Sequence, residues 1–319
     1  MTKSPDVIQV LVSAYSCRPG AVSEPGVAWR QLEALASDSR FRFTVITRLK
    51  NVSPIEDEVR RKSIDNLTVV GVDLPRWARF WKRGHLTMHL YYGLWQLAAW
   101  QRARALCRGQ KFHVAHHLSF MSVRTCFVPF LDIHSIVGPV GGAQVAPAGF
   151  GEVLLHPGKE RLRTWMIRLL SISPWWRLGL RRVGRYVLAN HDNLWVIPEG
   201  SRSRCVVQQI GWQVPKSPDG AAPATPRDRP VNVLTLYWGG RLIGWKGLEL
   251  LLRAIPLARA EGVLVRLDIT GKGPDEKHLR QVSTECGLDD CVAFHGYLPF
   301  AEVEAMQRSA DLIVFTSLH

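Results

Sequence analysis

Residues 238–247 read WGGRLIGWKG, and the order of secondary structure can be followed outward from this stretch. A run of strand-forming residues, 231–237, precedes it, and a run with helical periodicity, 248–260, follows it. We therefore expect a strand-to-helix turn. Glycines let the backbone approach a ligand closely, and the N-terminus of the following helix attracts anions. With Arg241 and Lys246 as two cations, the turn is predicted to hold phosphate.

Two solvated cations beside an ordinary strand-to-helix loop would give the same residues. The stretch also lacks the spacing of the P-loop, Gly-x4-Gly-Lys-Ser/Thr, because no Ser or Thr follows Lys246. The turn alone leaves both interpretations open.

Apolar strands alternate with helices through both halves of the chain, which predicts an α/β fold of two Rossmann-like, doubly wound parallel-sheet domains. The strands are expected at 7–14, 43–47, 67–72, 114–117, 133–137 and 194–197 in the first domain, and at 231–237, 264–270, 292–295 and 312–316 in the second. Five prolines fall within residues 213–230, which indicates an extended linker. The predicted boundaries are therefore 1–212 and 231–319, on either side of this linker.

The positive charge is confined to the first part of the chain. The 319 residues carry a net charge of +14, with 46% apolar and 21% charged residues, as expected of a globular protein. Residues 1–200 hold 27 Lys/Arg against 14 Asp/Glu, whereas residues 201–319 hold 14 against 13. This asymmetry favours an anionic partner such as lipid headgroups, nucleic acid or a phosphorylated acceptor. A solubility or genome-composition effect is the alternative, since Arg outnumbers Lys.

Two basic, aromatic regions, 76–83 and 159–185, stand out in this first part. Arg161, Trp165 and Arg168 have helical spacing, which suits a cationic helical face with aromatic anchors at an anionic membrane surface. Tryptophan and leucine at that spacing are equally typical of a protein core. No stretch is apolar enough to span a bilayer and no signal peptide is visible, so we expect a cytoplasmic protein, peripheral at most on the inner face of the cell membrane. The six scattered cysteines lack a Cys-x-x-Cys pair, which favours reduced thiols.

Five motifs, in order, resemble the retaining glycosyltransferases of family 4. They are CRPGAVSEPGVAW at 17–29, HHLSF at 116–120, GPVGG at 138–142, GRLI with the following Lys-Gly at 240–247, and GKGP at 271–274. The first is similar to the bacterial members whose loop reads Cys-x-Pro-Gly-x-x-Ser-Glu-Pro-Gly-Val-x-Trp. The resemblance implies the GT-B architecture, in which two Rossmann-like domains face a cleft.

The resemblance also implies roles for the matched residues. Arg241 and Lys246, beside Gly240, correspond to the pair that neutralises the donor diphosphate, where cations stabilise the charge of the leaving group. Gly26 matches the first-domain turn near the donor phosphate. His116 or His117 matches the histidine beside the transferred sugar; His116 fits the register better, and its neighbour stays the alternative. The implied acceptor-side residues are Ser23, Glu24, Gly141, Gly142 and Gln144, and the implied nucleotide-side residues are Gly271, Gly273, His295 and Gly296.

The sequence departs from the family pattern at several points. Val22 and Ala28 replace glycines of the first loop, and Ala143-Gln144 stands where Gly-Glu is common. The family's two glutamates, spaced Glu-x7-Glu after the strand that ends at Ser317, are not in the chain, nor is its closing helix. We therefore expect a chain that is incomplete at its C-terminus, with little or no activity in this form.

The function expected is transfer of a sugar from a nucleotide-sugar to a glycan or lipid-linked acceptor with retention of configuration, in bacterial surface-polysaccharide or glycolipid assembly. The resemblance calls for no metal or other cofactor, because the two cations neutralise the diphosphate. A sugar-nucleotide epimerase of the same fold is one alternative. A non-catalytic basic protein that binds anionic membranes is the other, and no nucleic-acid-binding motif is present.

Overall fold

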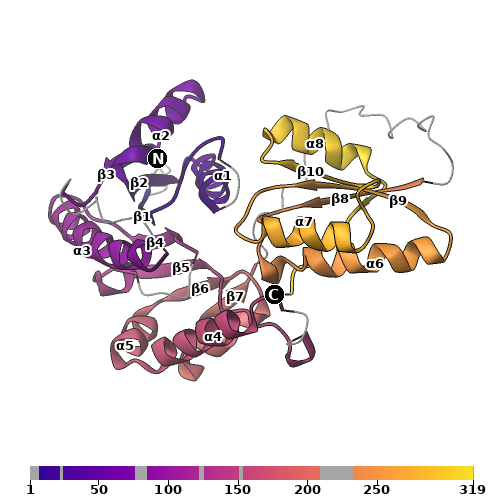
Figure 1. Ribbon diagram of the computed structural model, residues 1–319. Helices are drawn as coiled ribbons and strands as arrows, with labels where there is room; N and C mark the ends of the chain where they lie inside the picture. The colour runs from indigo at the N-terminus through magenta and orange to yellow at the C-terminus, as the bar shows by residue number, and fades with distance from the viewer. Residues whose placement is uncertain are drawn as a thin grey trace. The chain divides into compact units, whose positions relative to one another are not determined.

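The computed structural model describes residues 7–21, 24–75, 85–121, 126–150, 154–208 and 233–318. Ser23, the basic stretch 76–83 and the predicted linker 213–230 lie outside these ranges. The chain divides into two compact units, coloured from indigo to orange-yellow along the chain in Figure 1. The first comprises Met1–Gln144 with Trp165–Trp212, and the second comprises Val145–Thr164 with Gln213–His319.

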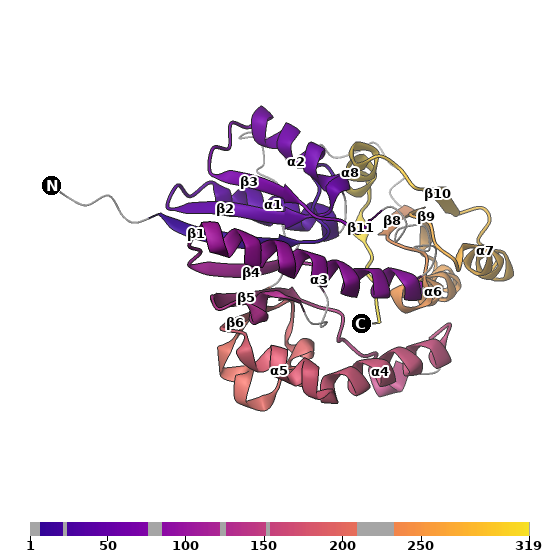
Figure 2. The ribbon, with the colours of Figure 1, turned by 90° about the vertical axis from the view of Figure 1, so that its left-hand side faces the viewer.

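The first unit is built on a parallel sheet of seven strands in the order β3-β2-β1-β4-β5-β6-β7. Figure 2 shows β3 through β6 side by side in this order. The order reverses between β1 and β4, as in a doubly wound fold. The strands are β1 (Ile8–Ala14), β2 (Phe41–Thr47), β3 (Leu67–Gly71), β4 (Val114–Ser119), β5 (His134–Val140), β6 (Arg185–Leu188) and β7 (Cys205–Val207).

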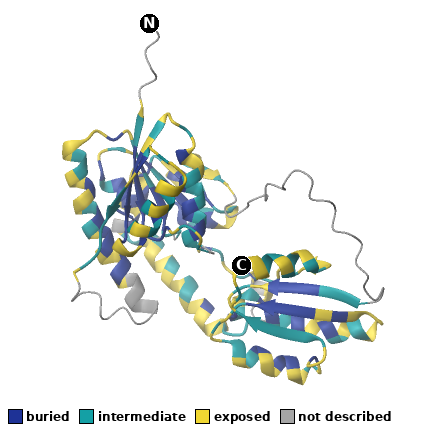
Figure 3. Cartoon of the chain, turned by 90° about the horizontal axis from the view of Figure 1, so that it is seen from above, coloured by how far each residue is buried: buried dark blue, intermediate teal, exposed yellow. Residues whose placement is uncertain are grey.

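Alternate side chains of β1 enter two separate hydrophobic clusters, because successive residues of a strand point to opposite faces. Leu11 packs in a cluster with Trp95, and Val12 packs in another with Leu32. Figure 3 shows the buried residues concentrated in the strands. The helices are α1 (Glu24–Ala36), α2 (Leu49–Arg61), α3 (His85–Gly109), α4 (Pro157–Ile172) and α5 (Pro174–Arg182).

The strand predicted at 194–197 is wrong. These residues belong to or directly follow a 3₁₀ helix, His191–Val196, and the last two strands of the sheet are β6 and β7. The apolar run is buried in the core beside Tyr186 without joining the sheet. Asn193 fixes the 3₁₀ helix, since its Oδ1 accepts a hydrogen bond from the Ala143 N–H at 3.0 Å. A short apolar run cannot by itself distinguish these two structures.

The second unit contains a parallel sheet of four strands in the order β10-β9-β8-β11. Its strands are β8 (Val233–Gly239), β9 (Leu264–Thr270), β10 (Val292–Gly296) and β11 (Leu312–Ile313), and its helices are α6 (Leu248–Ala260), α7 (Glu276–Glu285) and α8 (Phe300–Ser309). Sheet pairing of β11 is shorter than the predicted strand at 312–316. The core includes Leu252 of α6 and Leu267 and Ile269 of β9.

The segment Val145–Thr164 groups with the second unit, although the predicted first domain was continuous over 1–212. Its contacts explain the difference. The Leu155 side chain packs on the backbone of Gly244, and His156 Nε2 lies 3.0 Å from Asp275 Oδ1. Contacts distant in sequence override the sequential division here.

Two leucines of α6 allow a matched test of the second core. Leu252 is 0% exposed and Leu257 is 71% exposed. Leu252→Ala is expected to lower the free energy of unfolding by about 2–5 kcal/mol, since it leaves a cavity. Leu257→Ala is expected to change it by less than about 0.5 kcal/mol. Urea unfolding of the full chain measures both; equal effects would contradict the packing described.

Candidate functional site

The turn after β8 lies at the point where the strand order of the second sheet reverses. β8 pairs with β9 on one side and with β11 on the other, so loops diverge from this edge. Open parallel sheets bind ligands at such switch points, outside the carboxyl ends of the strands. The turn contacts the segment after β11 directly: the Thr316 hydroxyl donates to the Lys246 carbonyl at 2.9 Å, and the Leu318 N–H donates to the Trp245 carbonyl at 2.9 Å.

The two cations of this turn have no carboxylate to neutralise them among the residues that the structure describes. Arg241 is exposed, and Lys246 is half-buried with its Nζ 5.3 Å from the centre of the Phe315 ring. Burial lowers the pKa of Lys246. Unpaired cations beside the start of α6 give this edge a positive potential suited to an anion.

Glycine is required at two positions around the turn. Gly247 has φ +66°, and a Cβ there would lie 2.2 Å from the Thr316 carbonyl oxygen. Gly271 has φ +122°, and a Cβ there would lie 1.8 Å from the Gly240 carbonyl oxygen. Side chains would force these backbones apart, so the turns after β8, β9 and β11 can approach only because both residues are glycine.

Asp275 holds the turn from the other side. Its Oδ2 accepts a hydrogen bond from the Gly244 N–H at 2.9 Å, and its Oδ1 lies 3.0 Å from His156 Nε2. Its own N–H donates to the Leu242 carbonyl at 3.2 Å. One carboxylate thus links the turn, the start of α7 and the segment Val145–Thr164.

The residues predicted on the nucleotide side gather at the same edge. Gly271 N–H donates to the Gly296 carbonyl at 2.7 Å, which joins the ends of β9 and β10. Gly273 packs on the Leu242 backbone, where a Cβ would lie 2.0 Å from the carbonyl oxygen. His295 differs, because its Nε2 bonds Asp268 Oδ1 at 2.7 Å within the sheet.

In the first unit, Glu24 links the loop that follows β1 to the loop that follows β4. The strand order of the first sheet reverses between these two strands. Its Oε1 accepts a hydrogen bond from the Met121 N–H at 2.6 Å. Burial raises the pKa of this carboxyl, an effect opposed by the Met121 bond and the charge of Arg48. Gly26, two residues further, packs so closely that a Cβ would lie 1.7 Å from the Ala21 carbonyl oxygen.

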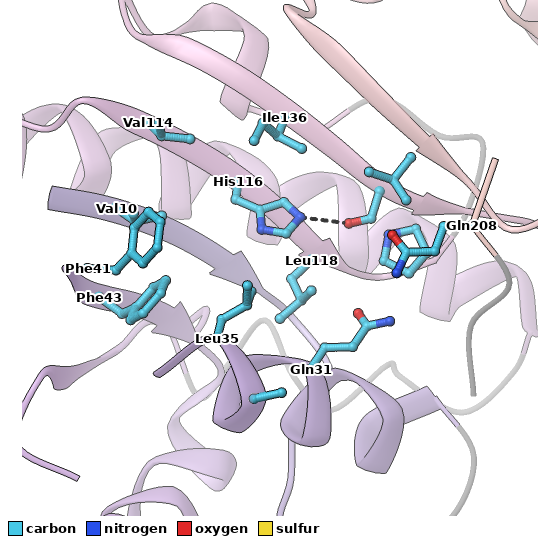
Figure 4. A pocket seen from close by; sticks show the side chains of 14 residues that line it. Val10, Gln31, Leu35, Phe41, Phe43, Val114, His116, Leu118, Ile136 and Gln208 are labelled. Carbon is cyan, nitrogen blue, oxygen red and sulfur yellow. Dashed lines mark hydrogen bonds between the residues drawn. The ribbon is translucent and has the colours of Figure 1, made fainter. Parts of the chain in front are cut away.

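The two candidate histidines face opposite sides of the sheet. His116 points into an apolar cavity of about 480 Å³ beside α1, where its Nε2 lies 2.9 Å from the Gly138 carbonyl oxygen (Figure 4). His117 lies on the other face, with Nδ1 3.1 Å from the Ser13 hydroxyl. Burial lowers the pKa of both, that of His117 to about 4. Burial thus favours the neutral form of each ring, and because they face opposite sides of the sheet, at most one of them can face a given ligand.

The glycines after β5 line an open turn. A Cβ at Gly141 would make only van der Waals contacts at 3.8 Å, and one at Gly142 would meet nothing within 4 Å, although φ there is +84°. Gln144 Oε1 accepts a hydrogen bond from the Gly142 N–H at 2.9 Å, so this amide stabilises the turn.

Sequence reasoning missed three residues at these edges. Arg48 directly follows β2, Asp275 follows the GKGP motif, and His156 belongs to the segment that groups with the second unit. Arg48 and Asp275 could have been found from the sequence, because one directly follows a predicted strand and the other a glycine motif, and parallel strands bring their carboxyl ends to one edge of the sheet. Nothing local in the sequence indicated His156.

Over the described ranges, no three His, Cys, Asp or Glu side chains cluster as they would around a metal ion. None of the helices in the described part of the chain combines the length and the apolar character needed to cross a bilayer.

Comparison with known proteins shows a GT-B fold. Over 97% of the chain, the structure is similar to that of Anabaena Alr3699/HepE in complex with UDP and glucose (TM-score 0.54, 14% identity, 74% of that chain). It is also similar over 98% of the chain to the N-terminal domain of Candida albicans trehalose-6-phosphate phosphatase (TM-score 0.61, 12% identity, 77% of that chain). At these identities the likeness concerns the fold alone.

Sequence comparison adds a domain assignment. Residues 234–319 match the family described as Glycosyl transferases group 1, which supports a glycosyltransferase. WcaL of Escherichia coli strain K12, named for glycosyl transfer in colanic acid biosynthesis, is 35% identical over 97 residues, or 30% of this chain. The match spans 22% of the length of that relative.

Two glycines with positive φ give a test of the close approach at the switch point. Gly262→Ala, at φ +83° in open space, is expected to cost about 1–2 kcal/mol of unfolding free energy through backbone strain alone. Gly247→Ala should cost roughly 1–3 kcal/mol more, because it also displaces Thr316. Chemical unfolding of both variants checks this; a smaller loss in Gly247→Ala would contradict the contact.

Proposed function

We propose that this chain belongs to a retaining glycosyltransferase of family 4, with Arg241 and Lys246 binding the diphosphate of a nucleotide-sugar donor. The observation that supports it most is the pair of cations without a described carboxylate partner at the switch point of the second sheet. The match to Glycosyl transferases group 1 covers this turn, and the motif order along the whole chain agrees with it.

The proposed chemistry follows from charge. When the bond between the sugar and the diphosphate breaks, both bonding electrons remain on the leaving diphosphate. Cations placed beside that group stabilise the developing charge more than the ground state and so lower the barrier. The planar guanidinium of Arg241 can form paired hydrogen bonds with phosphate oxygens, while Lys246 acts as a point charge. No metal is needed for this step.

The acceptor in this proposal is a glycan or a lipid-linked sugar of surface-polysaccharide or glycolipid synthesis. The WcaL name supports polysaccharide synthesis, and the Anabaena structure with UDP supports a uridine nucleotide as probe. We assign the acceptor to the first unit, near Glu24 and the open turn at Gly141 and Gly142. His116 or His117 would lie beside the transferred sugar.

Nucleotide binding tests the donor site directly. UDP at about 100 times its Kd is expected to stabilise the chain by about 2.7 kcal/mol. Arg241→Ala should weaken UDP binding at least about tenfold, because a charge-assisted phosphate contact is lost. Urea unfolding with and without UDP measures the stabilisation, and isothermal titration calorimetry of the full chain measures the loss of affinity.

Arg308→Ala is the matched control for this experiment. Arg308 lies near the C-terminal end of α8, on the surface, and bonds Glu304 one helical turn away. Its loss should leave UDP binding unchanged, since an exposed pair of this kind contributes little. Equal weakening by both variants, or no UDP binding by the parent chain, would reject the donor site.

We also propose peripheral contact with an anionic membrane through α4. Leucine, tryptophan and methionine at helical spacing form an exposed face, in which Trp165 is 59% and Leu169 is 50% exposed. Arg161 and Arg168 are exposed on the same helix. Apolar anchors flanked by arginine are the composition of helices that lie in the headgroup region.

Vesicle co-sedimentation tests this surface. Leu169→Glu should reduce binding to phosphatidylglycerol vesicles several-fold, because it places a charge among the apolar anchors. Leu257→Glu, at an exposed leucine of α6, should leave binding unchanged. High salt should weaken the parent chain, since the arginine contribution is screened. Equal binding by both variants would exclude α4 as the contact.

A further inference from the structure

Three cations lie where β1 and β2 end in the first unit. Arg18 is in the loop after β1, Arg48 directly follows β2, and Lys50 is in the first turn of α2. β1 and β2 are paired in parallel, so their carboxyl ends lie side by side. The three positive charges lie close enough to influence one another. The pKa of Lys50 is lowered chiefly by the charge of Arg48, then by burial and then by the charge of Arg18, whereas the charge of Asp73 raises it.

Arg48 is held in place by the protein. Its side chain is only 9% exposed, its guanidinium lies 4.1 Å from the centre of the Tyr15 ring, and its Nε donates to the Tyr15 carbonyl at 2.9 Å. Tyr15 is in turn packed edge-on against Tyr92 and Trp95. The Arg48 guanidinium is thus held against a rigid cluster of aromatic rings and has lost most of its contact with water. A bound anion can replace the hydration that it has lost.

None of these three cations forms an ion pair with a carboxylate of the described residues. Other cations of the same unit do: Arg40 bonds Asp38, Arg60 bonds Asp57, Arg61 bonds Glu58 and Lys62 bonds Glu33. The α2 N-terminus, which Arg48 precedes without a side-chain cap, adds to the positive potential at the same place.

Two carboxylates lie near this group and are engaged elsewhere. Glu24 accepts a hydrogen bond from the Met121 N–H, and Asp73 accepts from the Leu74 N–H and the Tyr91 hydroxyl. Both charges influence the group, since Arg48 affects the pKa of Glu24 and Asp73 affects that of Lys50. The excess positive charge at the edge is therefore reduced but not cancelled.

We propose that Arg18, Arg48 and Lys50 form a second anion site, which binds a phosphate or diphosphate group of the acceptor. The proposal rests on the proposed function, because it names the chemical class of the second substrate. Arg48 gives the site direction through its planar fork, and Arg18 and Lys50 close on the group as exposed, movable charges. A lipid diphosphate sugar or a sugar phosphate fits this description, whereas an uncharged glycan does not.

Inorganic pyrophosphate is the probe, titrated calorimetrically into the full chain saturated with UDP. It is expected to bind, and Arg48→Gln and Lys50→Gln should each weaken that binding about tenfold. Arg42→Gln is the matched control: Arg42 is an exposed cation near the opposite end of β2 and should have no effect. Arg48 also bonds Tyr15, so Arg48→Gln can fail to fold. In that case the test uses Lys50→Gln and Arg18→Gln instead, because the side chains of Lys50 and Arg18 make no described hydrogen bond.

The outcomes separate the sources of the anion. If saturating UDP abolishes pyrophosphate binding and Arg241→Ala weakens it, the anion is the donor diphosphate and the acceptor site is overturned. Equal loss in Arg42→Gln shows diffuse attraction and overturns it as well. If UDP itself fails to bind, the titration is repeated with Arg241→Ala/Lys246→Ala: pyrophosphate binding that still depends on Lys50 supports the second site while the donor proposal fails, and no binding rejects both.

Discussion

The constraint on which the second unit depends is the close approach of backbone turns at the carboxyl edge of its sheet. At residue 247 a single methyl group would meet the Thr316 carbonyl oxygen, and at residue 271 it would meet that of Gly240. This approach brings Lys246 beside Phe315 and allows the Thr316 hydroxyl to bond the Lys246 carbonyl. The position of the cations is therefore a result of backbone packing, and Arg241 and Lys246 need no side-chain partner to be fixed near one edge.

The two units handle positive charge in the same way. On the surface of α2, and on α6 and α8, arginines pair with glutamate or aspartate along the helix. At the carboxyl edges, Arg48, Lys50, Arg241 and Lys246 have no such partner among the described residues. Cations left without counterions keep their full attraction for a ligand, whereas paired cations have already satisfied most of theirs. The sites proposed for both substrates thus rest on the same electrostatic distinction.

Much of the fold could be predicted from the sequence because its signals are local. The apolar run of β1 and the strand-to-helix order around residues 238–247 are read from neighbouring residues, and both appear in the structure. The apolar run 194–197 was wrongly predicted as a strand, because a buried 3₁₀ helix and a buried strand can have the same apolar residues. For the site, the glycine motifs indicated the edge, but Arg48 and His156 depend on contacts with residues more than thirty positions away.

The assignment of Val145–Thr164 to the second unit changes the covalent connection between the units. The chain passes from one unit to the other after residues 144, 164 and 212, so three covalent connections join them where a single linker would give one. Cleavage within 209–232 would break the only covalent link to residues 233–319, which could then be retained only through their noncovalent contacts with Val145–Thr164. Residues 231–319 expressed alone would lack Leu155 and His156, which support the Gly244 turn. The region that matches Glycosyl transferases group 1 is consequently not self-contained: residues that support its Gly244 turn are encoded before the sequence of the first unit is complete.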